Sequence, residues 1–395
     1  MSKRYQGGVL GVGFNPLQAP NAPTIGTATA GGNNCASVPF TAPANVGGSA
    51  VTSYTYRSSP AGFAGAVAGS PITVTGLTTG QSYSFGVFAL NSYGPSPTSA
   101  FSNSITAVLD GTFGIFALGC AGGSSTTRNK YTYSGDAVSA GGAATVASQA
   151  GSAAGNSTVG IFALGGGGGA ARNKYTYSGC VVSAGGAATV ASQCGSAAGN
   201  STVGIFALGC AGGSSTTRNK YTYSGCVVSA GGAATAASFR GSAAGNSTVG
   251  IFALGRAPCP STTRNKYTYS GCVVSAGGAA TVATSFGSAA GNSTVGIFAL
   301  GFQGSPAFSG LNTRDKYTYS SCVVSAGTAA TAASYSGSAA GNSTVGIFAL
   351  GRAPCPSTTR NKYTYSGDVV AAGGAATAAS SVGSAASNGT TGVNT

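Results

Sequence analysis

The sequence predicts an all-β protein in which the C-terminal two-thirds forms a six-bladed β-propeller. A segment of about 46 residues occurs six times, and each copy contains four short stretches with the composition of β-strands. Gly is abundant, at 68 of 395 residues, and no stretch has the apolar periodicity of a helix. These features exclude helical repeats of similar length.

Four segments define the repeat. The first is Gly-Ser-Ala-Ala, and the second, Gly-Ile-Phe-Ala-Leu-Gly, is apolar and bounded by Gly, as expected of a strand buried on both faces. The third, Lys-Tyr-Thr-Tyr-Ser, alternates aromatic and polar residues with the period of a strand, and the fourth is Val-Val-Ser-Ala-Gly or a close variant. The second segment starts at Gly114, Gly160, Gly204, Gly250, Gly296 and Gly346, and the third at Lys130, Lys174, Lys220, Lys266, Lys316 and Lys362.

The order of these segments resembles the blade of kelch-type propellers. The resemblance covers residues 111–395 and implies a six-bladed kelch-like β-propeller over 108–395, with the four segments as strands a to d of each blade. The first copy begins at strand b, while the last strand a, Gly383 to Ser387, lies near the C-terminus. We therefore expect that segment to complete the first blade and leave no open edge. The alternative is an open solenoid, which would need polar caps, and the sequence shows none.

The copies differ mainly at two sites. One is the loop between strands b and c (the b–c loop), and the other is a pair of residues just before strand a (the variable pair). Both connections leave an antiparallel blade at the same end, so we expect one variable face. Its candidate binding residues are aromatic: Phe239, Phe286, Phe302, Phe308 and Tyr335. Variable loops on a rigid scaffold commonly bind ligands, although loops also tolerate neutral change.

Basic residues recur at the start of strand c. We predict a cationic ring near the variable face, formed by Arg128, Lys130, Arg172, Lys174, Arg218, Lys220, Arg264, Lys266, Arg314, Lys316, Arg360 and Lys362. Such a ring would bind an anionic glycan or polymer, or steer approach to a charged surface. The alternative is that these charges only keep an otherwise uncharged chain soluble. Even spacing around a ring does not match a nucleic-acid groove, so we expect no nucleic-acid partner.

The composition argues against an enzyme. The chain has no His, Glu or Trp, and its four acidic residues, Asp110, Asp136, Asp315 and Asp368, are scattered. Acid–base, nucleophilic and most metal chemistry therefore lack their usual side chains, and we expect no cofactor. The ten Cys show no Cys-x-x-Cys spacing, so we expect no metal site, few disulfides and mostly buried thiols. No apolar run is long enough for membrane insertion, and no apolar segment follows the basic N-terminus as in a secretion signal.

Residues 19–107 have a different pattern, with alternating stretches at the short spacing of a β-sandwich. Leu77-Thr-Thr-Gly-Gln-Ser-Tyr83, followed by Asn91-Ser-Tyr-Gly, resembles the fibronectin type III domain. The resemblance implies a spacer or adhesion module, with Tyr83 as its tyrosine corner and Val38 and Phe40 in place of the usual Trp. Residues 1–18 form a basic, Gly-rich arm that contains Lys3, Arg4 and Tyr5.

The arm resembles N-terminal segments of bacteriophage tail fibre and related virion proteins. This resemblance implies a tail, baseplate or fibre component that is located in the virion, forms a homo-oligomer, anchors to other virion proteins through Lys3, Arg4 and Tyr5, and presents the propeller for host attachment. A host-surface glycan or anionic polymer is the expected ligand. Two other functions stay open: a capsid-decorating or purely structural virion protein, and a bacterial carbohydrate-binding adhesin.

Overall fold

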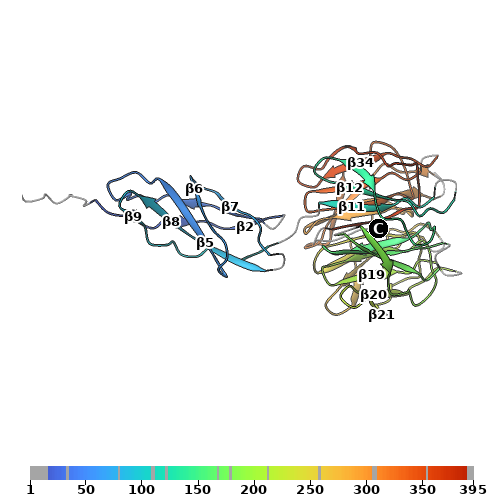
Figure 1. Cartoon of the computed structure of the whole chain (residues 1–395). Helices are drawn as coiled ribbons and strands as arrows, with labels where there is room; N and C mark the ends of the chain where they lie inside the picture. Colours follow the sequence, from blue (N-terminus) through green and yellow to red (C-terminus); the bar gives the residue numbers. More distant parts are fainter. Residues whose placement is uncertain are drawn as a thin grey trace, which may run out of the picture. The chain divides into compact units, whose positions relative to one another are not determined.

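The computed structural model describes residues 17–32, 35–78, 81–107, 112–120, 123–166, 169–177, 180–210, 213–256, 259–304, 309–352 and 355–388. The protein is all-β, built of many small antiparallel sheets, and the described residues contain no helix. The described residues therefore include no helix that could span a membrane. The chain divides into two compact units, Met1–Leu109 (unit 1) and Asp110–Thr395 (unit 2) (Figure 1).

The described residues of unit 1 form three sheets. They are the pair β1 (Thr24–Ile25) and β4 (Phe40–Thr41); the three strands β2 (Thr29–Gly32), β3 (Cys35–Val38) and β7 (Ile72–Val74); and the five strands β10 (Ile105–Thr106), β8 (Ser82–Asn91), β5 (Ser53–Ser59), β6 (Ala64–Val67) and β9 (Gly94–Pro95). Alternate residues of the larger sheets, such as Val38, Val74 and Val87, are fully buried in one core.

Tyr83, near the start of β8, is hydrogen-bonded to the segment that precedes this strand. Its ring is buried, and its hydroxyl accepts a hydrogen bond of 3.2 Å from the backbone N–H of Thr78, five residues earlier. Val38 and Phe40 are also buried in this core.

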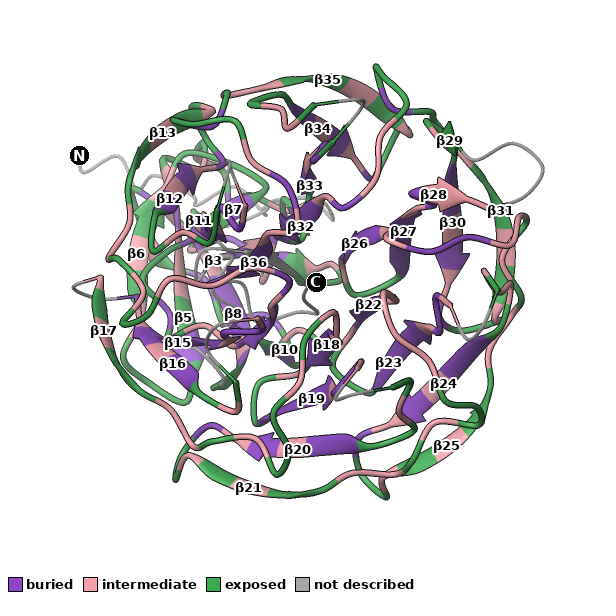
Figure 2. Ribbon diagram, turned by 90° about the vertical axis from the view of Figure 1, so that its right-hand side faces the viewer, coloured by how far each residue is buried: buried purple, intermediate pink, exposed green. Residues whose placement is uncertain are grey.

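Unit 2 consists of six four-stranded antiparallel sheets, one for each repeat (Figure 2). The first three are β36 (Ser384–Ser387), β11 (Phe113–Ala117), β12 (Arg128–Thr132), β13 (Ala137–Ala140); β14 (Ser152–Gly155), β15 (Val159–Ala163), β16 (Arg172–Thr176), β17 (Val181–Ala184); and β18 (Ser196–Gly199), β19 (Val203–Ala207), β20 (Arg218–Thr222), β21 (Val227–Ala230).

The other three sheets have the same order. They are β22 (Ser242–Gly245), β23 (Val249–Ala253), β24 (Arg264–Thr268), β25 (Val273–Ala276); β26 (Ser288–Gly291), β27 (Val295–Ala299), β30 (Arg314–Thr318), β31 (Val323–Gly327); and β32 (Ser338–Gly341), β33 (Val345–Ala349), β34 (Arg360–Thr364), β35 (Val369–Gly373). The b–c loop of the fifth copy adds a short hairpin of β28 (Phe302–Gln303) and β29 (Ser309–Gly310). The predicted a–b–c–d strand order is confirmed.

The last strand pairs with the first repeat. β36 lies antiparallel to β11, with Ala386 opposite Ile115 and Ala385 opposite Phe116, so the predicted pairing of the C-terminal segment is confirmed. Each first strand contacts the first strands of two neighbouring sheets: β14 contacts β36 and β18, and β32 contacts β26 and β36. In Figure 2 the six sheets surround a common centre, and the fourth strands lie at the periphery.

Small residues allow the strands near the centre to approach closely. Ala154 and Ala197 are fully buried where neighbouring sheets meet. A side chain at Gly204 would place its Cβ 3.2 Å from the Cβ of Ala154 and 2.8 Å from the hydroxyl oxygen of Tyr223. Gly204, Ala154 and Ala197 therefore belong to the packed core between sheets.

The six arginines of the predicted cationic ring are buried, which corrects that prediction. Each guanidinium lies between two sheets: Arg128 donates a hydrogen bond of 3.0 Å to the Asn173 side chain of the next sheet and lies 4.6 Å from the ring centroid of Phe162. The equivalent pairs are Arg172–Asn219, Arg218–Asn265, Arg264–Asp315, Arg314–Asn361 and Arg360–Asn129. We call these contacts clasps, because each guanidinium joins its own sheet to the next one through a hydrogen bond and an aromatic contact.

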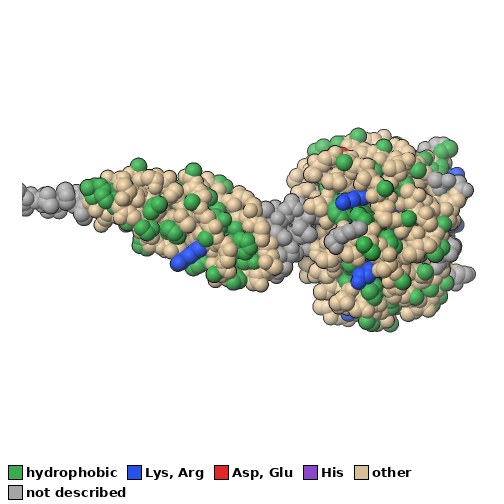
Figure 3. Space-filling view, in the orientation of Figure 1, with side chains coloured by type: hydrophobic (Ala, Val, Ile, Leu, Met, Phe, Trp, Pro, Cys, Tyr) green, Lys and Arg blue, Asp and Glu red, His purple; other side chains and the backbone are tan. Residues whose placement is uncertain are grey.

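The six lysines are half-buried, and three of them, Lys266, Lys316 and Lys362, contact the next sheet. Lys316 forms an ion pair of 2.9 Å with Asp368, and Lys362 one of 3.0 Å with Asp136. Both aspartates lie in turns that follow strand c, at the end of the sheets opposite the variable sites. Figure 3 accordingly shows separate Lys and Arg patches on the face in view and no continuous basic belt.

Candidate binding face

The two variable sites meet at one end of unit 2. The first residue of each variable pair bonds through its backbone to the first residue of the b–c loop in the same sheet. These contacts are Gln149 with Gly166, Gln193 with Cys210, Phe239 with Arg256, Ser285 with Phe302, Tyr335 with Arg352, and Ser381 with Cys120. The structure therefore brings together the residues in which the six copies differ most.

The second residue of each variable pair has an unusual backbone. Ala150, Cys194, Arg240, Phe286, Ser336 and Val382 all have positive φ, between 53° and 59°. This left-handed region favours Gly and is unfavourable for Phe and especially for β-branched Val. The chain carries six different side chains at a position where Gly would cost least, and strain of this kind is concentrated at functional sites.

Six backbone hydrogen bonds join these residues into a ring. Each N–H donates to the carbonyl oxygen of its counterpart in the preceding copy, over 2.7 to 2.9 Å: Cys194 to Ala150, Arg240 to Cys194, Phe286 to Arg240, Ser336 to Phe286, Val382 to Ser336, and Ala150 to Val382. The bonds fix the backbone at all six positions, so the side chains differ while the scaffold stays constant.

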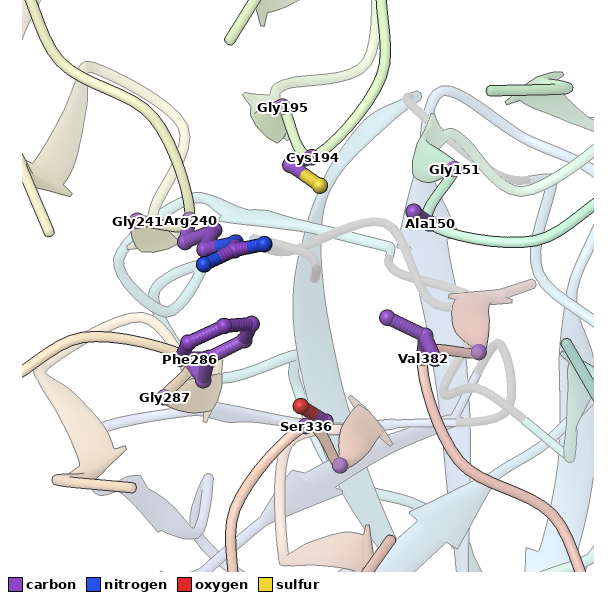
Figure 4. Close-up of a pocket in the computed structure, with 12 residues that line it drawn as sticks. Ala150, Gly151, Cys194, Gly195, Arg240, Gly241, Phe286, Gly287, Ser336 and Val382 are labelled. Carbon is purple, nitrogen blue, oxygen red and sulfur yellow. The ribbon is translucent and has the colours of Figure 1, made fainter. Parts of the chain in front are cut away.

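The ring surrounds a cavity of about 40 Å³ at the centre of this end (Figure 4). Its lining is the six side chains and the glycine that follows each of them. Glycine is required there, because a Cβ at Gly151 would collide with the carbonyl oxygen of Ala163. The volume admits a few water molecules or one small group, but not a sugar ring.

Aromatic residues cluster on one side of the cavity. The rings of Phe286, Phe302 and Tyr335 lie 5.3 to 6.3 Å apart in edge-to-face arrangements. The Arg240 guanidinium lies 4.2 Å from the ring centroid of Phe286 and 5.0 Å from that of Phe239. All five side chains are half-buried. We call them the aromatic–Arg240 cluster.

The cluster contains four of the five predicted aromatic binding residues. The fifth, Phe308, lies outside the described residues, as do Lys3, Arg4 and Tyr5 of the predicted anchor. Arg240 was not predicted as a binding residue, although a cation within a variable pair, next to Phe239, was a signal for it.

The other side of the cavity carries small residues: Ala150, Val382 and Cys194. Burial raises the pKa of the Cys194 thiol, the nearby Cys210 raises it further, and Arg240 opposes the shift. Nine cysteines of the described residues are free. Seven are half-buried, such as Cys226 against an apolar cluster, and Cys259 and Cys355 are exposed, so the expectation of mostly buried thiols is wrong. No group of three Cys or Asp side chains in the described ranges could hold a metal ion.

The carboxylates of the described residues are engaged elsewhere. Asp315 is buried against Arg264 at 2.7 Å, and Asp136 and Asp368 pair with lysines at the opposite end of the sheets. The cavity lining contains Arg240 and no acidic residue. The candidate face therefore combines a positive charge with half-exposed aromatic rings, a combination that suits an anionic ligand with an apolar surface.

Comparisons with known proteins do not assign a family. No family model matches the chain, and no curated protein matches it. Solved structures that match include domains A168–A170 of titin, at 26% identity, and the twitchin kinase region of C. elegans, at 22% identity, each with a TM-score of 0.21 over 22% of this chain. The matches span 32% and 16% of those chains, and at this TM-score they carry no argument about fold or function.

Proposed function

We propose that unit 2 is a six-bladed, kelch-like β-propeller that acts as the non-enzymatic recognition head of a bacteriophage tail, baseplate or fibre component. Unit 1 is a fibronectin type III-like spacer, and residues 1–18 anchor the protein to other virion proteins. The head faces outward and binds the host surface.

One observation carries the recognition role: six unlike side chains occupy one strained backbone position around a cavity, on an otherwise repeated scaffold. The strands keep almost the same sequence in every copy, and the differences gather at one end of the sheets. A purely structural ring would be satisfied by Gly at all six positions, whereas a binding site requires particular side chains.

Other features support the remaining parts of the proposal. The pairing of β36 with β11 and the hydrogen bond from Arg360 to Asn129 join the last repeat to the first, as in a closed propeller. The hydrogen bond between Thr78 and the Tyr83 hydroxyl is the contact that a tyrosine corner makes in fibronectin type III domains. The assignment to a virion depends on the resemblance of the N-terminal arm to segments of bacteriophage tail fibre and related virion proteins.

Deletion of residues 2–12 tests the anchor. We expect the deleted protein to fold normally, as judged by its melting temperature, yet to be missing from purified phage particles by mass spectrometry. Incorporation at the wild-type level would contradict an anchoring role for the arm.

Exchange of one b–c loop tests the recognition role. Replacing Phe302–Thr313 with the sequence of Cys120–Thr127, the shorter loop of the first copy, removes Phe302 from the aromatic–Arg240 cluster. We expect host adsorption of the particles to fall while particle assembly continues. The control changes a b–c loop on the other side of the cavity. There, Cys210–Thr217 is replaced with the sequence of Arg256–Thr263. A capsid-decorating protein would show unchanged adsorption with either exchange.

A further inference from the structure

We propose that the aromatic–Arg240 cluster binds an acidic glycan, with a carboxylate or phosphate group at Arg240 in the central cavity and a sugar ring on Phe286, Phe302 and Tyr335. This inference rests on the proposed recognition function and specifies its ligand. It follows from the state of Arg240, the charges of the face and the size of the cavity.

Arg240 is held in place yet keeps donor capacity. Its guanidinium packs on Phe239 and Phe286, and its Nε atom is buried with no hydrogen-bond partner among the described residues. In Figure 4 the side chain extends into the cavity between Cys194 and Phe286. Because the Arg240 side chain lines the cavity, an oxyanion bound there would form a charge-assisted hydrogen bond with its guanidinium.

The surrounding charge favours an anion. Arg256 and Arg352 begin the b–c loops that bond to Phe239 and Tyr335, so two more arginines border the cluster. The aspartates of the described ranges pair with Arg264, Lys316 and Lys362, away from the cavity. An approaching anion therefore meets positive potential, and no carboxylate of the described ranges competes with it.

The aromatic rings and the small cavity select the rest of the ligand. The half-exposed rings of Phe286, Phe302 and Tyr335 offer apolar surface to the C–H face of a sugar. A cavity of about 40 Å³ takes only the acidic group, so the sugar stays on the rim. Single-stranded nucleic acid also combines phosphates with stacking, but it requires a basic groove that follows its backbone rather than one enclosed cation.

Calorimetric titration of the full-length protein tests the inference. The probes are trigalacturonic acid, its methyl ester, glucose 6-phosphate, glucose and a single-stranded oligothymidine. We expect trigalacturonic acid or glucose 6-phosphate to bind at least about tenfold more tightly than its neutral counterpart, the ester or glucose. Whichever acid binds identifies the group as a carboxylate or a phosphate.

Matched variants locate the site. The R240A variant puts an alanine at position 240. The ring already accommodates alanine at the equivalent position, Ala150. We expect R240A to remove the preference for the acidic probe. V181A, on the outer strand β17, and R57A, which removes one exposed positive charge from unit 1, should bind like the wild type.

Several results would overturn the inference: equal binding of acidic and neutral probes, no binding of any probe, tighter binding of the oligothymidine, or an unchanged preference in R240A. Host adsorption separates this inference from the proposed function. If R240A particles adsorb normally while the Phe302–Thr313 exchange abolishes adsorption, the recognition role stands and the acidic-glycan site is wrong.

Discussion

At the scale of one residue, Val382 illustrates the backbone strain in the ring of six positive-φ residues. Its φ of 53° places a β-branched side chain in the left-handed region. We predict that V382G stabilises the protein by about 1 kcal/mol, because Gly adopts this conformation without the steric cost. Urea unfolding measures the change. The control is V159G, in a strand where the Val is buried and φ is not positive, which should destabilise the protein. Destabilisation by V382G would contradict backbone strain at the ring.

One of the six clasps between sheets carries a formal charge pair. Arg264 contacts Asp315, whereas the other five arginines contact Asn. We predict that D315N changes the free energy of unfolding by less than about 1 kcal/mol, because it recreates the clasp of the other copies. R264A should lose about 3 kcal/mol, because it leaves Asp315 buried without its counterion.

The double variant R264A/D315N is the control for this prediction. It should be more stable than R264A alone, since Asn in place of Asp leaves no unpaired buried charge. Denaturant midpoints of the four proteins measure the coupling. A double variant less stable than R264A would show that the carboxylate is not paired as described.

Asp368 links stability to pH. Burial alone would raise its pKa, but the hydrogen bond from Tyr363 and the hydrogen bond and charge of Lys316 outweigh burial and lower the pKa. A lowered carboxyl pKa stabilises the fold above the unfolded value of about 4, and this stability is lost as the pH falls through the folded-state pKa. We predict that D368N melts at a lower temperature than wild type at pH 7 and that the difference shrinks toward pH 3. A difference independent of pH would contradict the role of Lys316.

At the scale of the element, the last strand is the most informative. Removing residues 384–395 deletes β36 and exposes the paired edge of β11. We predict loss of a cooperative melting transition in unit 2 and aggregation in size-exclusion chromatography, because an unpaired inner strand is an aggregation site. The control removes only residues 389–395 and keeps Asn388, whose side chain accepts hydrogen bonds from the N–H groups of Thr112 and Phe113. If both truncations melt like wild type, β36 does not stabilise the first sheet.

The strands were predictable from sequence because their signals are local. Short apolar runs bounded by Gly, and the alternation of strand c, can be seen directly in the sequence. The strand order and the pairing of β36 were therefore predicted correctly. The contacts of strand c agree with this alternation. Arg128 packs on Phe162 of the next sheet, whereas Tyr131 packs on Phe116 of its own sheet and lies near Arg360 of the preceding sheet.

The surroundings of strand c were not predictable in the same way. Alternation tells which residues share a side, but it does not tell whether that side faces water or another sheet. The arginines were therefore placed on the surface, whereas neighbouring sheets bury them. The same reason explains why Arg240 was missed: its importance arises from the positive-φ ring and the cavity, which are tertiary features.

At the scale of the whole molecule, we propose that one end of unit 2 recognises the host surface. The test is whether an excess of the purified full-length protein blocks adsorption of phage particles to host cells. We predict that the wild type blocks adsorption and that a variant with Ala at Phe239, Phe286, Phe302 and Tyr335 does not. A control with Ala at the exposed Val181, Val227 and Val273 of the outer strands should block like the wild type. Equal blocking by all three proteins, or by none, would contradict recognition through this face.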